Sequence, residues 1–278
     1  MSTLLLPLVS TGNVPQLSTD LILHSLSAEF EFIRELDSLY LFPFAGPLDF
    51  VRGSHTNLYE HTEGKSFTTP LELFYSSKLN LYVVQQRSPV IQNYENNFCQ
   101  EVLLPLIQEL KISQLVIFDA TDEIDENVAV SQLRKSPFSL GICDLTQIHD
   151  VVAEFEEKLQ LNDEAPQQTT NALFNFSDTS FQSSISTQQI TFKICYHLLK
   201  SQSISKHLKG IQYFNTYVQE GDNSEDAVAA CNQLPLFIKS FPKLEQFQTP
   251  EQFQTPVSWE GVYGVRNAPT SFDEGLYI

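Results

Sequence analysis

The run of apolar residues at positions 4–9 (LLLPLV) is the feature that most restricts what this chain can fold into. It shows no alternation of polar and apolar side chains, so a strand formed from it must be covered on both faces. A turn at Thr11-Gly12-Asn13 follows, and then a helix that Ser18 or Thr19 is expected to cap. The apolar positions that indicate this helix are Leu21, Ile22, Leu26 and Phe30. A doubly covered strand, a turn and a helix predict an α/β fold.

Signals for strands and helices continue to alternate along the rest of the chain. Strands are predicted at residues 39–44, 71–75, 79–85, 115–118, 212–218 and 257–262. The second and third of these are expected to form a hairpin. Helices are predicted at residues 94–110, 151–161, 190–199 and 227–237. Pro105 is expected to kink the first of these helices, and Asp222 or Ser224 to cap the last.

These elements predict one domain over residues 1–264, followed by a flexible C-terminal tail over residues 265–278. The domain is expected to be a three-layer α/β sandwich with a central mixed sheet. Loop insertions are expected near residues 46–69, 162–189 and 242–256. No apolar run approaches the roughly 20 residues that a membrane-spanning helix requires, so we expect a soluble protein.

The charge of the chain restricts its partners. It carries 34 Asp+Glu against 16 Lys+Arg, a formal net charge of -18 at pH 7. Such a surface repels nucleic-acid phosphates and anionic membranes, so neither is expected as a partner. A protein partner should be basic where the two touch. The four cysteines show no paired spacing and are expected to be reduced thiols of a cytosolic or nuclear protein; they are Cys99, Cys143, Cys195 and Cys231.

Catalytic motifs of fixed spacing are missing: the sequence contains no G-x-S-x-G, no H-E-x-x-H and no glycine-rich phosphate loop. We therefore assign no catalytic residue, metal ligand or cofactor. The turn at Thr11-Gly12-Asn13 has one glycine, with Pro15 close behind, so a structural turn is favoured over a phosphate site. The acidic loop at residues 119–126 has carboxylates that suit Mg²⁺ but no fixed spacing, so a solvated loop is favoured. A nucleotide- or nucleoside-handling enzyme is the alternative function.

The last three residues, Leu276, Tyr277 and Ile278, follow a polar run at residues 266–275 that has too little apolar surface to fold back on the domain. A free terminus with an apolar residue, a tyrosine and a carboxylate is suited to insertion into a pocket on another protein. There the carboxylate would pair with a lysine or with backbone N–H groups. Frayed termini are common, so a generic adaptor with an irrelevant tail is a second alternative.

Four stretches of the chain resemble the signatures of one family, in the family's order and spread over nearly the whole sequence. They are residues 6–17 (LPLVSTGNVPQL), 81–89 (LYVVQQRSP), 220–223 (EGDN) and 256–259 (PVSW). The family is that of proteasome assembly chaperone 2, and its fungal branch fits best. Pro15 stands where other members often have glycine, which bears on the shape of the first turn.

This resemblance implies a non-enzymatic chaperone of the cytoplasm and nucleus, with an α/β sandwich fold. It implies a heterodimer with proteasome assembly chaperone 1, seated on the outer face of the α-subunit ring of the 20S core particle while that ring assembles. Family members dock through a C-terminal hydrophobic-Tyr-any motif, which falls here on Leu276, Tyr277 and Ile278. In the family the terminal carboxylate meets a lysine between adjacent α subunits, and the acidic charge of this chain suits such a pocket.

Overall fold

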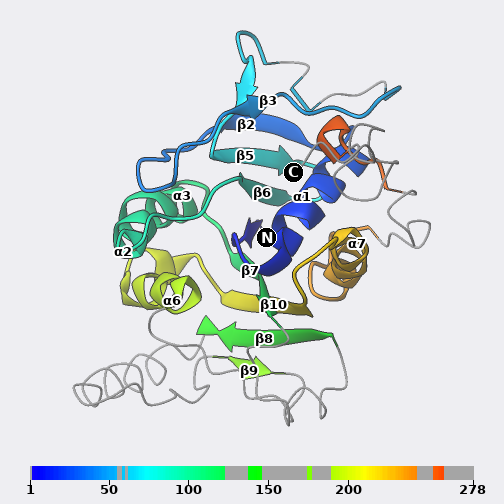
Figure 1. The fold of residues 1–278 in the computed structure, drawn as a ribbon. Helices are drawn as coiled ribbons and strands as arrows, with labels where there is room; N and C mark the ends of the chain where they lie inside the picture. The colour runs from blue at the N-terminus through cyan, green and yellow to red at the C-terminus, as the bar shows by residue number, and fades with distance from the viewer. Residues whose placement is uncertain are drawn as a thin grey trace.

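Figure 1 shows three layers, with a mixed β-sheet in the middle and helices on both faces. The structure is a computed structural model and describes residues 2–54, 58–59, 62–122, 137–145, 174–176, 189–242 and 253–259. Eight strands form the sheet in the order β2-β5-β6-β1-β7-β10-β8-β9. The four central strands run parallel, and the strands on either side of them pair antiparallel. The predicted three-layer α/β sandwich with a mixed sheet is therefore confirmed.

The strands of the sheet are β1 (Thr3–Pro7), β2 (Glu31–Glu35), β5 (Leu71–Ser76), β6 (Leu81–Gln86), β7 (Gln114–Asp122), β8 (Phe138–Asp144), β9 (Asn175–Phe176) and β10 (Gly210–Val218). A separate two-stranded sheet pairs β3 (Gly46–Pro47) with β4 (Phe67–Thr68). The helices are α1 (Val14–Ser25), α2 (Glu95–Asn97), α3 (Leu104–Glu109), α6 (Ile190–Lys200) and α7 (Ser224–Gln233). Shorter turns are η1 (Thr11–Asn13), η2 (Phe98–Leu103), η4 (Ile204–Lys206), η5 (Leu234–Leu236) and η7 (Val257–Trp259).

β1 lies in the middle of the sheet because its side chains are apolar on both faces. Leu4 and Leu6 point into the core that η2, α3 and α6 cover, whereas Leu5 joins the core beneath α1 and α7. All three side chains are fully buried. In Figure 1 these two helix layers stand on opposite sides of the sheet. The doubly covered strand predicted at residues 4–9 is confirmed, although it ends at Pro7.

α1 begins earlier than predicted, and neither Ser18 nor Thr19 caps it. The cap position is Asn13, and Pro15 occupies the first turn, where its missing N–H has no helical partner to lose. Both predicted caps are buried inside the helix. The Ser18 hydroxyl donates to a backbone carbonyl of α7 at 3.2 Å, and the Thr19 hydroxyl donates to the Pro15 carbonyl at 2.7 Å. The helix ends at Ser25, before the last apolar position used to predict it.

Two predicted strands are wrong. Residues 39–44 form a single bridge, between Leu41 and Val90, and residues 257–259 form the 3₁₀ turn η7. In each segment one apolar side chain is buried against the finished domain, namely Leu41 and Trp259. Alternating apolar residues indicate strands in the sequence. In the structure each segment instead runs over the surface of the domain and buries one side chain, without a neighbouring strand to pair with. Residues 260–262 of the second prediction lie outside the described residues.

The helix predicted at residues 94–110 is confirmed. Its regular spacing is interrupted by a π-helical turn, which lies where a kink at Pro105 is predicted. α2 and α3 are joined by η2, which is a π-helical turn. Pro105 lies in the first turn of α3, directly after it. Proline has no N–H to donate to the preceding turn, and the wider π spacing accommodates the missing hydrogen bond.

The predicted hairpin is confirmed as β5 and β6, and the strands at residues 115–118 and 212–218 as parts of β7 and β10. The helices at residues 190–199 and 227–237 are confirmed as α6 and α7. The predicted cap of α7, Asp222 or Ser224, is wrong by one residue, because the cap position is Asn223 and Ser224 already lies in the helix. The Asp222 carboxylate still accepts the N–H of Ser224 at 3.1 Å. The helix predicted at residues 151–161 lies outside the described residues.

Candidate functional site

The predicted docking residues Leu276, Tyr277 and Ile278 lie outside the described part of the chain, whose last residue is Trp259. The structure therefore describes how the chain is held just before the predicted tail. It also describes two places where the four stretches that carried the family resemblance meet.

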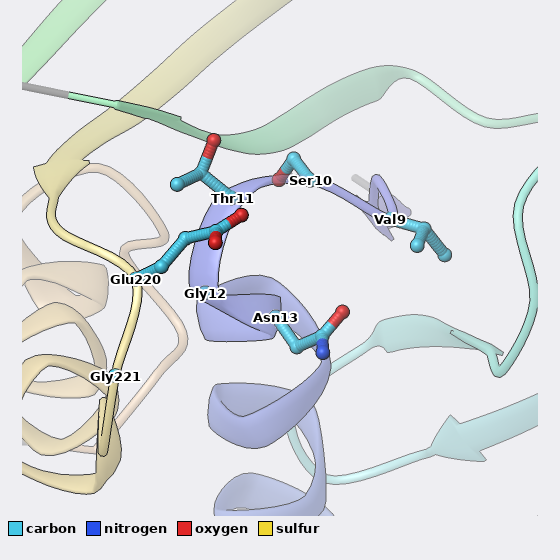
Figure 2. Close-up of a pocket in the computed structure, with 7 residues that line it drawn as sticks. All are labelled: Val9, Ser10, Thr11, Gly12, Asn13, Glu220 and Gly221. Carbon is cyan, nitrogen blue, oxygen red and sulfur yellow. The ribbon is translucent and has the colours of Figure 1, made fainter. Parts of the chain in front are cut away.

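The first meeting place is a surface pocket of about 460 Å³ between the loops that follow β1 and β10. Figure 2 shows the Glu220 side chain reaching toward the turn η1, with Asn13 at the start of α1. The lining residues are Val9, Ser10, Thr11, Gly12, Asn13, Glu220 and Gly221. They come from two of the four matched stretches, residues 6–17 and 220–223.

Gly12 brings these two loops into close contact. Its φ is 63°, and a Cβ at this position would lie 2.7 Å from both Cγ and Oδ1 of Asn223. Asn223 is buried and donates to the Gln219 carbonyl at 2.8 Å and to the Asp226 carboxylate at 3.1 Å. The close approach therefore requires glycine, and it fixes the end of β1 against the start of α7.

The lining of this pocket disfavours a phosphate ligand. Among the described lining residues Glu220 alone is charged, and its carboxylate would repel a phosphate. The Ser10 hydroxyl already accepts the Ala120 N–H at 3.0 Å and donates to the Leu8 carbonyl at 3.3 Å, so it ties β1 to β7. Pro15 removes one N–H from the first turn of α1. The geometry is that of a structural junction, as favoured by the sequence.

The acidic segment after residue 118 begins inside the sheet, because β7 continues to Asp122. Asp119 is partly buried, and desolvation raises the pKa of its carboxyl group. That carboxyl group accepts the Tyr213 hydroxyl at 3.0 Å and the Ala120 N–H at 2.8 Å. Residues 123–126 lie outside the described residues. Within the ranges that the structure describes, no three His, Cys, Asp or Glu side chains gather to hold a metal ion.

The second meeting place is a polar cluster buried under α1, centred on Asp20. The Asp20 carboxylate accepts both terminal nitrogens of Arg87, at 2.9 and 3.0 Å, and the Gln85 amide at 2.5 Å. Its side chain is 6% exposed and that of Arg87 is 17% exposed. The indole N–H of Trp259 also donates to it, at 3.4 Å. Residues 81–89 and 256–259, the other two matched stretches, thus meet at one carboxylate.

A second buried carboxylate, Glu72 of β5, continues this polar cluster toward β2. It accepts the ammonium group of Lys65 at 2.7 Å and the hydroxyl of Tyr59 at 2.7 Å. Burial, together with the charge of Glu72, raises the pKa of the Tyr59 hydroxyl. Lys65 also pairs with Glu35 of β2 at 2.8 Å. These contacts hold the long connection between β3 and β4 onto the sheet.

All four cysteines lie among the described residues, and each is buried and outside any disulfide bond. Burial raises the pKa of the Cys99 and Cys231 thiols to about 12, and it raises that of Cys195 well above its usual range. Such thiols are protonated at neutral pH and are poor nucleophiles. The prediction of reduced thiols agrees with four cysteines that form no disulfide bond.

The sequence analysis did not identify Asp20 as a site residue. Asp20 lies on an amphipathic helix, and a carboxylate on such a helix is normally expected to face solvent. Its partners did carry a signal, since Arg87 and Trp259 fall in the matched stretches. No pattern along the chain indicates that these stretches pair, because they are joined only by the folded sheet.

Among the described helices, none has the length and apolar character to cross a bilayer.

Comparison with known proteins agrees with this fold. A family model described as the PAC2 family matches residues 4–236. A solved structure from Thermoplasma acidophilum, described as a protein of unknown function, covers 90% of this chain and 80% of its own, with a TM-score of 0.53 and 12% identity. That likeness supports the fold alone.

Two curated relatives define the branch within the family. The Saccharomyces cerevisiae protein named proteasome assembly chaperone 2 is 37% identical over 98% of this chain and 98% of its own length. The Homo sapiens protein of the same name is 24% identical over 97% of this chain and 94% of its own. The chain therefore belongs to the PAC2 family and, within it, to the proteasome assembly chaperone 2 family.

Proposed function

We propose that this protein is a non-enzymatic chaperone for assembly of the 20S proteasome. The observation that carries the proposal is the 37% identity to the Saccharomyces cerevisiae proteasome assembly chaperone 2 over 98% of both chains. The fold supports it, because the matched stretches form a buried framework and an acidic pocket poorly suited to nucleotides. A nucleotide- or nucleoside-handling enzyme has no comparable support in the described residues.

In this proposal the protein pairs with proteasome assembly chaperone 1, and the pair sits on the outer face of the α-subunit ring in the cytoplasm and nucleus. Leu276, Tyr277 and Ile278 are the docking residues, with the terminal carboxylate on a lysine between adjacent α subunits. The net charge of -18 favours a lysine-lined pocket. Docking there promotes ring assembly and blocks activators that use the same kind of tail.

Three residues bury little area, so their own affinity for the ring is modest. A second tail on the partner chaperone multiplies that affinity through effective concentration. A change in pocket geometry as the core particle matures then releases the pair without ATP. Equal binding of a tail peptide to mature and immature rings would argue against this release step.

Co-purification tests the proposal. Tagged full-length protein and a variant lacking residues 276–278 are each co-expressed with the partner chaperone, and the bound subunits are identified by mass spectrometry. The full-length protein is expected to recover the partner and α subunits, and the truncated variant to keep the partner but lose most of the α subunits. Recovery of α subunits by neither protein would contradict the proposed function.

A further inference from the structure

Residues 253–259 are packed against the domain just before the predicted tail. Phe253 and Trp259 are 4% and 1% exposed, and both belong to the core beneath α1 and α7. The backbone N–H of Gln254 donates to the hydroxyl of Ser25, at the end of α1, at 3.0 Å. In Figure 1 the orange turn η7 lies beside α1. Residues 253–259 are therefore packed on the body of the domain.

Polar contacts hold this segment in one position. Asp49, which is 7% exposed, accepts both the backbone N–H of Ser258, at 3.2 Å, and its hydroxyl. The Val257 N–H donates to the Phe50 carbonyl at 2.9 Å. Two adjacent residues of the C-terminal segment are thus bonded to two adjacent residues of the connection between β3 and β4. A segment fixed by packing alone could slide, whereas these bonds set its register.

Asp20 ties the same segment to the centre of the domain. Its two carboxylate oxygens each accept one terminal nitrogen of Arg87. The Oδ2 atom also accepts the indole N–H of Trp259. Arg87 compensates the charge of this buried carboxylate, and hydrogen bonds to a charged acceptor are stronger than those between neutral groups. We call Asp20, Asp49, Ser258 and Trp259 the C-terminal anchor.

We propose that the C-terminal anchor fixes the point from which residues 260–278 leave the domain, and that it thereby sets the strength with which Leu276–Ile278 dock on the α ring. This inference rests on the proposed function. Docking by a tethered segment depends on its effective concentration at the pocket, which falls as the tether lengthens. The anchor therefore strengthens ring binding without touching the ring.

The expected effect follows from the tether length. With residues 253–259 in place, 19 residues follow Trp259; with Phe253 and Trp259 both released from the core, 36 residues follow Pro242, the last described residue of the preceding segment. Effective concentration falls with about the −3/2 power of length for a flexible tether, so release weakens tail docking roughly threefold.

The test compares variants of the full chain in complex with its partner chaperone. Phe253→Ala combined with Trp259→Ala removes both buried rings by which residues 253–259 join the core, and with the indole the bond to Asp20. Asp49→Asn combined with Ser258→Ala is a milder release that keeps the Trp259 packing. Ser203→Ala, which removes a hydroxyl near Gln108 on the opposite helix layer, is the control. Amide hydrogen exchange reports the opening of residues 257–259. Binding of the complex to immobilised α rings gives the dissociation constant.

We expect both release variants to exchange faster at residues 257–259, with partner binding unchanged. The variant without both rings should bind α rings roughly threefold more weakly than the wild type, and the milder variant should lie between the two. Ser203→Ala should match the wild type. Faster exchange with unchanged ring affinity would overturn the inference. If the variant without both rings unfolds, the milder variant decides by the same two readouts.

A variant lacking residues 276–278 separates the inference from the function on which it rests. If this deletion weakens ring binding while the release variants do not, the anchor has no role in docking and the proposed function stands. If the deletion leaves ring binding unchanged, both the docking tail and the anchor's role in it are wrong. A free peptide of residues 265–278 should displace the release variants from the ring more readily than it displaces the wild type, because their tails rebind at a lower effective concentration.

Discussion

Gly12 occupies a position that no larger residue can share with Asn223. We expect Gly12→Ala to destabilise the protein by about 2–3 kcal/mol, because it combines a left-handed backbone with a Cβ placed 2.7 Å from the Asn223 side chain. Urea unfolding measures the change. Gly64→Ala is the matched control, since Gly64 has a φ of 78° but nothing within 4 Å of its Cβ position. It should cost about 1 kcal/mol. Equal losses would show that the contact with Asn223 contributes nothing.

Arg87 compensates a buried charge, so its loss should be costly. Arg87→Met leaves the Asp20 carboxylate without its cation, and we expect a loss of about 3 kcal/mol in the free energy of unfolding. Arg34→Met is the matched control, because its pair with Glu109 is 44% and 56% exposed and a surface pair contributes under about 1 kcal/mol. Chemical denaturation compares the two. A loss at Arg87 no larger than that at Arg34 would contradict a buried ionic role.

His24 lends the fold a sensitivity to acid. Burial lowers the pKa of the His24 side chain below the usual 6.5, and the charge of Arg87 acts in the same direction. The charges of Asp20 and Asp49 raise that pKa, but the effect of burial is larger. The unfolded chain therefore takes up the proton first as the pH falls, and the folded state loses stability below about pH 6.5. Above that pH the residue is neutral in both states, and this contribution is constant.

The variant His24→Gln isolates this effect. The difference in unfolding free energy between wild type and variant should be constant above about pH 7 and should shift against the wild type between about pH 6.5 and 5. Urea unfolding at several pH values measures it. A difference independent of pH over this interval would show that His24 takes up its proton equally in both states.

At the scale of elements, the central strands carry the stability and the outer ones carry little. Leu5→Ala in β1 should cost about 2–5 kcal/mol, because the side chain is fully buried between sheet and helices. Ile33→Ala in the edge strand β2 should cost under about 1 kcal/mol, because Ile33 is 41% exposed. Denaturant unfolding of both variants checks the ranking. Equal losses would contradict a core centred on β1.

The same difference explains which elements the sequence predicts. β1, β6 and β7 are nearly continuous apolar runs and were found, because both of their faces are covered. β2 reads EFIRE, and an edge strand of that composition does not stand out from a loop. The opposite error arose at residues 39–44 and 257–259, where single buried side chains imitate the alternation of a strand. The periodicity of apolar residues indicates which side chains are buried. It identifies a strand only where a neighbouring strand is present to form hydrogen bonds with it.

At the scale of the whole molecule, the layered fold and the family were predictable, whereas the long-range contacts were not. Short apolar runs alternating with helical patterns indicated the sandwich. The four matched stretches indicated the family but not their pairing in space, because Gly12 meets Asn223, and Asp20 meets Trp259, across more than 200 residues. The predicted docking residues follow from the family resemblance and from the chemistry of the tail.

The measurement that tests the central claim most directly is α-ring assembly from purified α subunits, followed by native mass spectrometry. Subunits are mixed with no chaperone, with the pair formed by this protein and its partner, or with the pair carrying Tyr277→Ala. Our account predicts that the wild-type pair raises the yield of complete rings and remains bound to them, and that Tyr277→Ala loses most of both effects. Ring yields that are the same with and without the wild-type pair would contradict the role of this protein as an assembly chaperone.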